Sequence, residues 1–259
     1  GAARLAAKAA LRAGAGLVTI ASPLDAAEEN AAHLTAIMLR TADTAGQFKA
    51  LLKDERINPL VLGPGMGVDA NTRSLATAAL GAVRPCDLDA DALTSFANHV
   101  PALGAAIKAS EDTILTPHTG EFHRLFGTFD GDKLTAARQA AKSSGAVIIF
   151  KGADTVIASP DGRAAINANA PPWLATAGAG DVLSGVAGAH RALGMPPFEA
   201  AWAAVWLHGR AGELIGPGLT AEDLDTGLRG AIGELVLGRL CFSSSMTSLP
   251  RKNEIAVRI

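Results

Sequence analysis

Apolar and polar positions along the chain predict alternating helices and strands. Residues 2–13 have the alanine-rich composition of a helix, which glycines then end, and the apolar run 17–21 that follows is typical of a strand. Residues 146–150 are apolar without alternation, as in a strand buried on both faces. Further strand patterns lie at 58–62 and 113–115, and further helical patterns at 71–80, 121–126, 132–143, 181–193 and 198–214. This order predicts an α/β protein with a mainly parallel central sheet.

Two segments depart from that order. Residues 155–158 and 164–166 flank Asp161-Gly162 and predict a hairpin near a sheet edge. Residues 239–259 show neither helical nor strand periodicity around their serine-rich stretch, so we expect a divergent, disordered tail there. We therefore expect one domain over 1–238 and a tail over 239–259.

Composition narrows the class of protein. Of 259 residues, 23 are basic and 25 acidic, which gives a formal net charge of -2 and argues against nucleic-acid binding by bulk charge. No apolar run is long enough to span a membrane, and the first residues do not resemble a signal peptide, so we expect no membrane partner. Two cysteines favour a reducing, cytoplasmic location. Hydrophobic residues make up 49% of the chain, which favours a large core or a homo-oligomer.

Candidate chemistry lies in turns that follow predicted strands, where open parallel sheets bind their ligands. Five such turns carry unusual residues: 63–67 (GPGMG), 87–93 (DLDADAL), 116–121 (TPHTGE), 150–155 (FKGADT) and 175–181 (ATAGAGD). The last runs directly into a predicted helix, so its glycines allow backbone N–H groups to surround a phosphate at a helix N-terminus. Asp181 beside that phosphate is a candidate general base or, equally, an N-cap.

The other turns leave alternatives open. His118 is suited to a polar substrate and Glu121 to a metal-bound water, although both residues also suit helix capping. Lys151 is suited to nucleotide phosphates, or is simply solvated. Asp89 and Asp91, on the same face of an extended segment, suit magnesium held through water or a helix cap. The 63–67 loop either lies against a ligand or forms a tight turn.

In order and spacing, the motifs GPGMG, DADAL, TPHTGE, KGADTVIASPDG and LATAGAGDVLSG resemble those of the NAD(P)H-hydrate dehydratases over roughly residues 1–235. The resemblance implies a three-layer α/β/α, ribokinase-like fold. It also implies nucleotide-dependent dehydration of the S form of NADHX or NADPHX to NADH or NADPH. In this reaction the hydrate hydroxyl is phosphorylated, with ADP or ATP as co-substrate and Mg2+ as cofactor, and phosphate is then lost. Bacterial members favour ADP, and an NAD(P)H-hydrate epimerase is the implied functional partner.

The resemblance also assigns roles to residues. It implies that Asp181 is the catalytic base and that Glu121 organises magnesium through water. The implied hydrate contacts are Ala3 (or Ala2), Gly67, His118 and Asp181; the implied nucleotide contacts are Lys151, Gly152, Ala153, Asp154, Thr155 and Gly180; the implied anion hole is Gly178, Ala179 and Gly180.

The chain departs from the family pattern in places. The resemblance implies a strand before the first helix, for which the sequence shows no counterpart, so we expect a sheet without its first strand. Two alternatives remain: a vitamin-type hydroxymethyl kinase of the same fold, and an inactive dinucleotide-binding module. His118 argues against the kinase, because the resemblance implies that kinases of this fold tend to carry asparagine at the position of His118.

Overall fold

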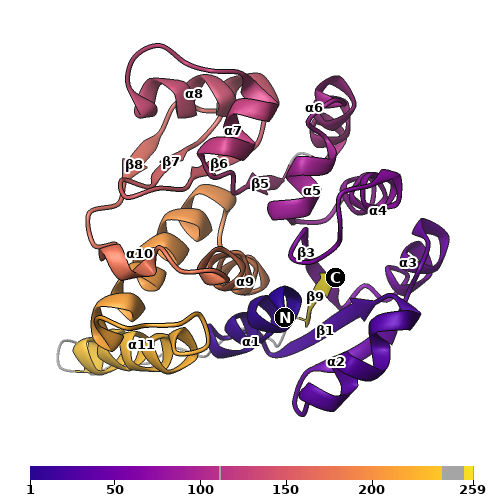
Figure 1. Ribbon diagram of the computed structural model, residues 1–259, viewed down its shortest axis with the longest axis horizontal. Helices are drawn as coiled ribbons and strands as arrows, with labels where there is room; N and C mark the ends of the chain where they lie inside the picture. Colours follow the sequence, from indigo (N-terminus) through magenta and orange to yellow (C-terminus); the bar gives the residue numbers. More distant parts are fainter. Residues whose placement is uncertain (111, 241–253, 259) are drawn as a thin grey trace.

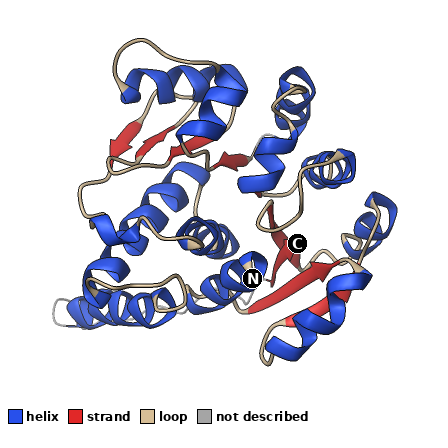
Figure 2. Ribbon diagram, viewed as in Figure 1, coloured by secondary structure: helices blue, strands red, loops and turns tan. Residues whose placement is uncertain are grey.

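The fold is an α/β/α sandwich, seen in a computed structural model that describes residues 1–110, 112–240 and 254–258 (Figures 1 and 2). The strands are β1 (Leu17–Ser22), β2 (Met38–Thr41), β3 (Ile57–Leu62), β4 (Cys86–Leu88), β5 (Thr113–Leu115), β6 (Val147–Phe150), β7 (Val156–Ala158), β8 (Ala164–Ile166) and β9 (Glu254–Arg258). The α-helices are α1 (Ala2–Arg12), α2 (Ala27–His33), α3 (Ala45–Leu51), α4 (Ala70–Leu80), α5 (Ala90–Ser95), α6 (Val100–Ser110), α7 (Thr119–Phe126), α8 (Lys133–Ser144), α9 (Ala179–Ala192), α10 (Pro197–Ile215) and α11 (Leu224–Leu240).

The described strands form one sheet in the order β2-β1-β9-β3-β4-β5-β6-β7-β8. All neighbours from β2 to β6 pair in parallel, whereas β7 pairs antiparallel with both β6 and β8. This confirms the mainly parallel sheet and the hairpin at its edge. The carboxyl ends of the parallel strands therefore meet at one edge, where the turns with candidate chemistry lie.

Two apolar cores cover the two faces of the sheet. Alternation along the strands divides their side chains: Val61 packs with α1, α9, α10 and α11, whereas Leu60 and Leu62 pack with the layer of α3 to α8. Small residues bring α1 and α9 very close, because a Cβ at Gly185 of α9 would lie 2.0 Å from the carbonyl oxygen of Ala6. The expected three-layer architecture is confirmed.

Strand β9 differs from the expectation of a disordered tail. Residues 254–258 pair in parallel with β1 on one side, through Thr19 and Ala256, and with β3 on the other, through Leu62 and Arg258. The backbone groups of β1 and β3 need partners at this position, and β9 supplies them. The sheet thus has an interior strand, β9, where we expected one strand fewer, while residues 241–253 and 259 of the predicted tail lie outside the described residues.

The sequence did not predict several elements. Residues 87–93 are not one extended segment: β4 ends at Leu88, and α5 begins at Ala90, which has a φ of 44°. Because the chain turns between them, Asp89 and Asp91 bond to different partners, as described below. Helices α2, α3, α6 and α11 and the edge strand β2 also lie where no periodicity was recognised. None of the helices in the described residues combines the length and apolar character needed to cross a membrane.

Candidate active site

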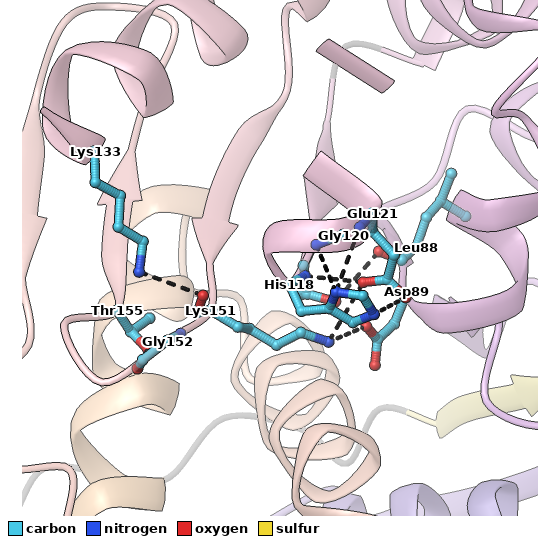
Figure 3. A network of polar contacts seen from close by, with 10 residues as sticks. Leu88, Asp89, His118, Gly120, Glu121, Lys133, Lys151, Gly152 and Thr155 are labelled. Atoms are coloured by element: carbon cyan, nitrogen blue, oxygen red, sulfur yellow. Dashed lines mark hydrogen bonds and ion pairs between the residues drawn. The ribbon is translucent and has the colours of Figure 1, made fainter. Parts of the chain in front are cut away.

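Ionisable side chains from three turns meet at the carboxyl ends of β4, β5 and β6: Asp89, His118 with Glu121, and Lys151 (Figure 3). Lys151 Nζ, directly after β6, lies 2.7 Å from Asp89 Oδ1 after β4 and 4.0 Å from Glu121 Oε2 in α7. Burial lowers the pKa of Lys151, but Asp89, Glu121 and Asp181 raise it by more, so the net pKa is raised. Lys151 is therefore a fixed cation, and the interpretation of it as simply solvated is wrong.

Asp181 is the third residue of α9. The N-cap of α9 is Gly178, which has a φ of 87°, so the alternative in which Asp181 caps the helix is wrong. Burial and the neighbouring Asp89 carboxylate raise the pKa of Asp181 to about 6, although Lys151 opposes this shift. A carboxyl group with that pKa is largely ionised at neutral pH and accepts protons better than an ordinary aspartate.

The glycines of the 178–180 turn are required by close contacts. A Cβ at Gly178 would lie 2.7 Å from Leu5 Cδ1 and 2.9 Å from Ala221 Cβ. A Cβ at Gly180 would lie 3.3 Å from Lys151 Nζ, so the lysine reaches the N-terminus of α9. The backbone N–H groups at that helix end and the ammonium group together provide a positive region suited to phosphate.

His118 and Glu121 cap α7, as one of the two expectations had it. The Nδ1 atom of His118 accepts from the N–H groups of Gly120 (2.9 Å) and Glu121 (3.3 Å), and Glu121 Oε2 accepts from the N–H of His118 (2.9 Å). Burial and the nearby Lys151 lower the pKa of His118, which favours the neutral ring. Because Nδ1 accepts two N–H groups, the proton of the neutral ring lies on Nε2. Nε2 lies 3.5 Å from Glu121 Oε1, and the side chain is 55% exposed, so a ligand can reach this N–H from solvent.

Gly67 and Asp91 lie in neighbouring turns. The N–H of Gly67 donates to Asp91 Oδ2 at 2.8 Å, and a Cβ at Gly67 would meet open space. Asp91 thus holds the glycine loop rather than sharing a face with Asp89. Gly63 packs so tightly against the carbonyl of Asp89 that a Cβ would lie 1.7 Å away, which ties this loop to the end of β4.

Ala3, the implied hydrate contact in α1, is 1% exposed and belongs to the apolar core against α9. Its methyl group is turned to the protein interior, so any ligand contact there would come from the backbone. Ala2, the alternative, is only partly buried at the start of the same helix.

A cavity of about 550 Å³ opens beside the N-terminus of α9, and we call it the α9 cavity. Its walls include four of the five residues in the 151–155 loop (Lys151, Gly152, Ala153 and Thr155) together with Ala179 and Gly180. The opposite wall is apolar, with Pro171, Leu174, Leu183 and Val205 among its residues. The structure thus brings together five of the six residues implied for nucleotide binding; the sixth, Asp154, does not line the cavity.

Two residues near the cavity were missed by the sequence analysis. His208 of α10 lines it, and burial lowers its pKa to about 4, so it is neutral. Lys133 of α8 holds the 151–155 loop from outside the cavity. His208 gives no sequence signal within its helical pattern, whereas Lys133 is an unusual cation at the start of a helix.

Comparisons with known proteins identify the family of this chain. The family model described as NAD(P)H-hydrate dehydratase matches residues 1–226. The chain is 39% identical to the ADP-dependent (S)-NAD(P)H-hydrate dehydratase of Neisseria meningitidis over 189 residues, which are 69% of this chain and 60% of that protein. It is 45% identical to the bifunctional NAD(P)H-hydrate repair enzyme of Mycobacterium leprae over 160 residues, 61% of this chain and 33% of that protein. The chain therefore spans less than two thirds of these curated relatives.

Among solved structures, the ADP/ATP-dependent NAD(P)H-hydrate dehydratase of Bacillus subtilis, co-crystallised with ATP and Mg2+, superposes with a TM-score of 0.73 at 26% identity. The match covers 90% of this chain and 84% of that one. A ribokinase-like protein of Enterococcus faecalis, at 22% identity and a TM-score of 0.76, supports the fold alone. The sequence resemblance is thus confirmed, and the chain belongs to the NAD(P)H-hydrate dehydratase family.

Proposed function

We propose that this protein converts the S form of NADHX or NADPHX back to NADH or NADPH in a nucleotide-dependent dehydration. The observation that carries the proposal is the position of Asp181, whose pKa is raised to about 6 at the N-terminus of α9, beside Lys151 and the α9 cavity. Family membership and the ADP-dependent relative from Neisseria meningitidis support it. The enzyme would be a lyase that uses the geometry of a kinase site.

In the first step, the carboxylate of Asp181 accepts the proton of the hydrate hydroxyl. The hydroxyl oxygen then attacks the terminal phosphorus of the nucleotide, and the bond from that phosphorus to the bridging oxygen breaks. ADP thus becomes AMP, or ATP becomes ADP. Lys151 and the N–H groups of Gly178, Ala179 and Gly180 stabilise the transferred phosphoryl group, so the chemistry relies on positioning and charge.

In the second step, the new phosphate ester leaves. The ring nitrogen donates its lone pair to the carbon that carries the ester, phosphate departs with the electrons of its C–O bond, and a proton is lost from the adjacent ring carbon. The dihydronicotinamide results. We assign His118 Nε2–H, Gly67 and the backbone at Ala3 to the hydrate, since all three belong to turns or helix ends at this edge of the sheet.

The carboxylates fit a magnesium ion held through water. Glu121 is 4% exposed and its Oε2 already accepts the N–H of His118, while Asp89 Oδ1 is bonded to Lys151, so each carboxylate has one oxygen left for a metal-bound water. In the described part of the chain, no three His, Cys, Asp or Glu side chains are grouped to hold a metal. Glu121 would therefore orient a metal-bound water, and the ion would neutralise charge on the nucleotide phosphates.

The donor we favour is ADP, because the Neisseria meningitidis relative is named as ADP-dependent; ATP is the alternative, as in the name of the Bacillus subtilis enzyme. We also propose that an NAD(P)H-hydrate epimerase supplies the S form, since several relatives are named as bifunctional repair enzymes. A cytoplasmic location fits the free, buried thiol of Cys86.

A homo-oligomer is supported by apolar surface. Trp202 and Trp206 lie one turn apart on α10 with 44% and 36% of their surface exposed. Exposed indole rings of this kind are enriched in subunit interfaces. Sedimentation of the purified protein should therefore show a species larger than the 26.3 kDa chain.

The test of function is the absorbance at 340 nm of NADHX with the protein, Mg2+ and either ADP or ATP. Growth of the dihydronicotinamide band with one nucleotide would establish the reaction and identify the donor. Binding of ADP by folded protein without any absorbance change would favour the inactive binding module. Accumulation of a phosphorylated vitamin instead would favour the hydroxymethyl kinase.

A further inference from the structure

Lys133 occupies a position that helix electrostatics disfavour. It is the first residue of α8, directly after the N-cap Asp132, where the partial positive charge of the helix end repels a cation. Its side chain is nevertheless only 15% exposed. A lysine that is both desolvated and placed at a helix N-terminus needs compensating contacts elsewhere.

Those contacts are all to the loop that follows β6. Lys133 Nζ donates to the carbonyl oxygen of Asp154 (2.9 Å), to Asp154 Oδ1 (2.9 Å) and to the carbonyl oxygen of Lys151 (3.3 Å). An ammonium group has three protons, so each finds an acceptor. The same nitrogen lies 4.7 Å from the ring centroid of Phe150, where a cation–π contact adds to the attraction.

The ammonium group clamps both ends of a short turn. The carbonyls of Lys151 and Asp154 are three residues apart, and Gly152 lies between them so close that a Cβ there would be 2.5 Å from Lys133 Nζ. Inside the turn, Thr155 Oγ1 accepts the N–H of Gly152 (3.2 Å) and donates to its carbonyl (2.9 Å). Figure 3 shows Lys133 reaching the backbone of Lys151 from the side opposite to Asp89.

This turn forms one wall of the α9 cavity, whereas Lys133 is not part of that wall. Lys151 is thereby held at three points: its side chain by Asp89, its N–H by the carbonyl of Pro117 (2.9 Å), and its own carbonyl by Lys133. Removal of Lys133 would leave the carbonyls of Lys151 and Asp154 without their shared donor, although the contacts of Lys151 to Asp89 and Pro117 would remain. The residues that face the cavity would then have to be ordered by the ligand, which weakens binding.

We infer that Lys133 is a positioning residue for the nucleoside di- or triphosphate, fixing the 151–155 turn and the Lys151 ammonium before the nucleotide binds. The inference rests on the proposed nucleotide site in the α9 cavity. It also reassigns Asp154: its carboxylate ties the turn to Lys133 and does not contact the nucleotide.

The test compares Lys133→Met with Lys142→Met, a matched change of an exposed lysine on the same helix. Calorimetry with MgADP should show a Kd about tenfold higher for Lys133→Met, equivalent to ~1.4 kcal/mol, and a Kd within about twofold of the unchanged protein for Lys142→Met. The methionine keeps the apolar stem over Phe150, so a packing role alone would leave the Kd unchanged. Binding of NADHX should be unaffected, which a general loss of structure would not allow.

A second measurement covers the case in which Lys133→Met folds poorly. Asp154→Asn changes a carboxylate that is 65% exposed and keeps the Asp154 carbonyl. It should raise the Kd for MgADP by a smaller factor and speed amide exchange in residues 151–155 of the protein without nucleotide. Unchanged exchange and unchanged Kd in both variants would overturn the inference.

The outcomes separate this inference from the proposed function. If the unchanged protein binds MgADP, Lys133→Met weakens that binding and NADHX is not dehydrated, the inference holds and the function fails. If NADHX is dehydrated and Lys133→Met has the unchanged KM for ADP, the function holds and the inference fails. No binding of any adenine nucleotide by the unchanged, folded protein would overturn both.

Discussion

Asp87 and Asp89 are two residues apart at the end of β4, and both are buried, but their surroundings differ. Asp89 meets Lys151 Nζ at 2.7 Å. Asp87 lies near Arg191 of α9, and neither of its oxygens has a hydrogen-bond partner among the described residues. Burial raises the pKa of Asp87 to about 7, against the attraction of Arg191, which is itself paired with Asp112.

The difference shows how position along a strand sets what a buried acid can do. At the carboxyl end of β4, Asp89 lies within reach of Lys151 from the turn after β6 and organises the site. One pleat earlier, Asp87 lies against α9 without a dedicated partner, and the cost of its burial appears as a raised pKa. Variants of the site residues and of Asp87 test this difference through turnover and the free energy of unfolding.

The largest effect is expected for Asp181→Asn. The amide keeps the shape of the side chain but cannot accept the hydroxyl proton, so turnover should fall about 10²–10⁴-fold while the midpoint of thermal unfolding stays close to that of the unchanged protein. In the unchanged protein, turnover should decline as the pH falls through about 6, because protonation removes the base. Turnover by Asp181→Asn near the unchanged level would exclude Asp181 as the base.

Lys151→Met removes the partner of a buried carboxylate. Breaking such a pair leaves Asp89 uncompensated and should lower the free energy of unfolding by about 3–5 kcal/mol, measured by urea denaturation. Asp89→Asn in the same chain should recover part of that loss, since the amide carries no charge. Equal stability of the single and double variants would show that Asp89 does not depend on Lys151.

Asp87→Asn should raise the free energy of unfolding, whereas Lys151→Met lowers it. Because the pKa of Asp87 is about 7 in the folded protein and 3.8 ordinarily, the folded state holds the proton more tightly. The free energy of unfolding should therefore fall as the pH rises from about 4 to about 7, by up to ~4 kcal/mol, and then level off.

Asp87→Asn should flatten this pH dependence and stabilise the protein at pH 8, as urea denaturation at a series of pH values would show. Asp25→Asn, a change at an exposed carboxylate, serves as the control. A pH profile of unfolding that is the same for Asp87→Asn and the unchanged protein would place the proton elsewhere.

The smallest of these effects is expected at His118, where two roles can be separated. His118→Ala removes both the N-cap of α7 and the exposed Nε2–H, so it should lower stability by about 1 kcal/mol and weaken NADHX binding. Asn is also a good N-cap, so His118→Asn should restore the stability but not the affinity. Recovery of NADHX affinity by asparagine would mean that the histidine acts through the cap alone.

The sheet and the site turns were predictable from local pattern. Residues 113–115 form β5 as predicted, since a short apolar run with β-branched residues that ends at a turn is consistent with a buried strand. The 178–181 turn was recognised because glycine before a helix has a specific use at an anion site. Local pattern could not predict which side chains bond to one another. The bond between Lys151 and Asp89 and the bonds from Lys133 to the 151–155 turn join residues that are far apart in sequence.

The misjudged segments have physical reasons. Asp89 and Asp91 were expected to share a face because alternation was assumed, but the chain turns at Ala90 into α5 and sends Asp91 to Gly67. Helix α11 lacks a clear apolar stripe, since small residues such as Gly227 pack against α10 with a Cβ position 2.5 Å from the carbonyl of Ala211. Strand β9 follows a serine-rich stretch and becomes a strand only through its two neighbours in the sheet.

The place of β9 between β1 and β3 also has a consequence for synthesis of the chain. Thr19 of β1 and Ala256 of β9 are paired, so two neighbouring strands of the sheet come from segments that are far apart in the chain. Such distant contacts form slowly and only after the later segment has left the ribosome. Until then the edges of β1 and β3 remain open, and we expect the nascent chain to depend on chaperones during that interval.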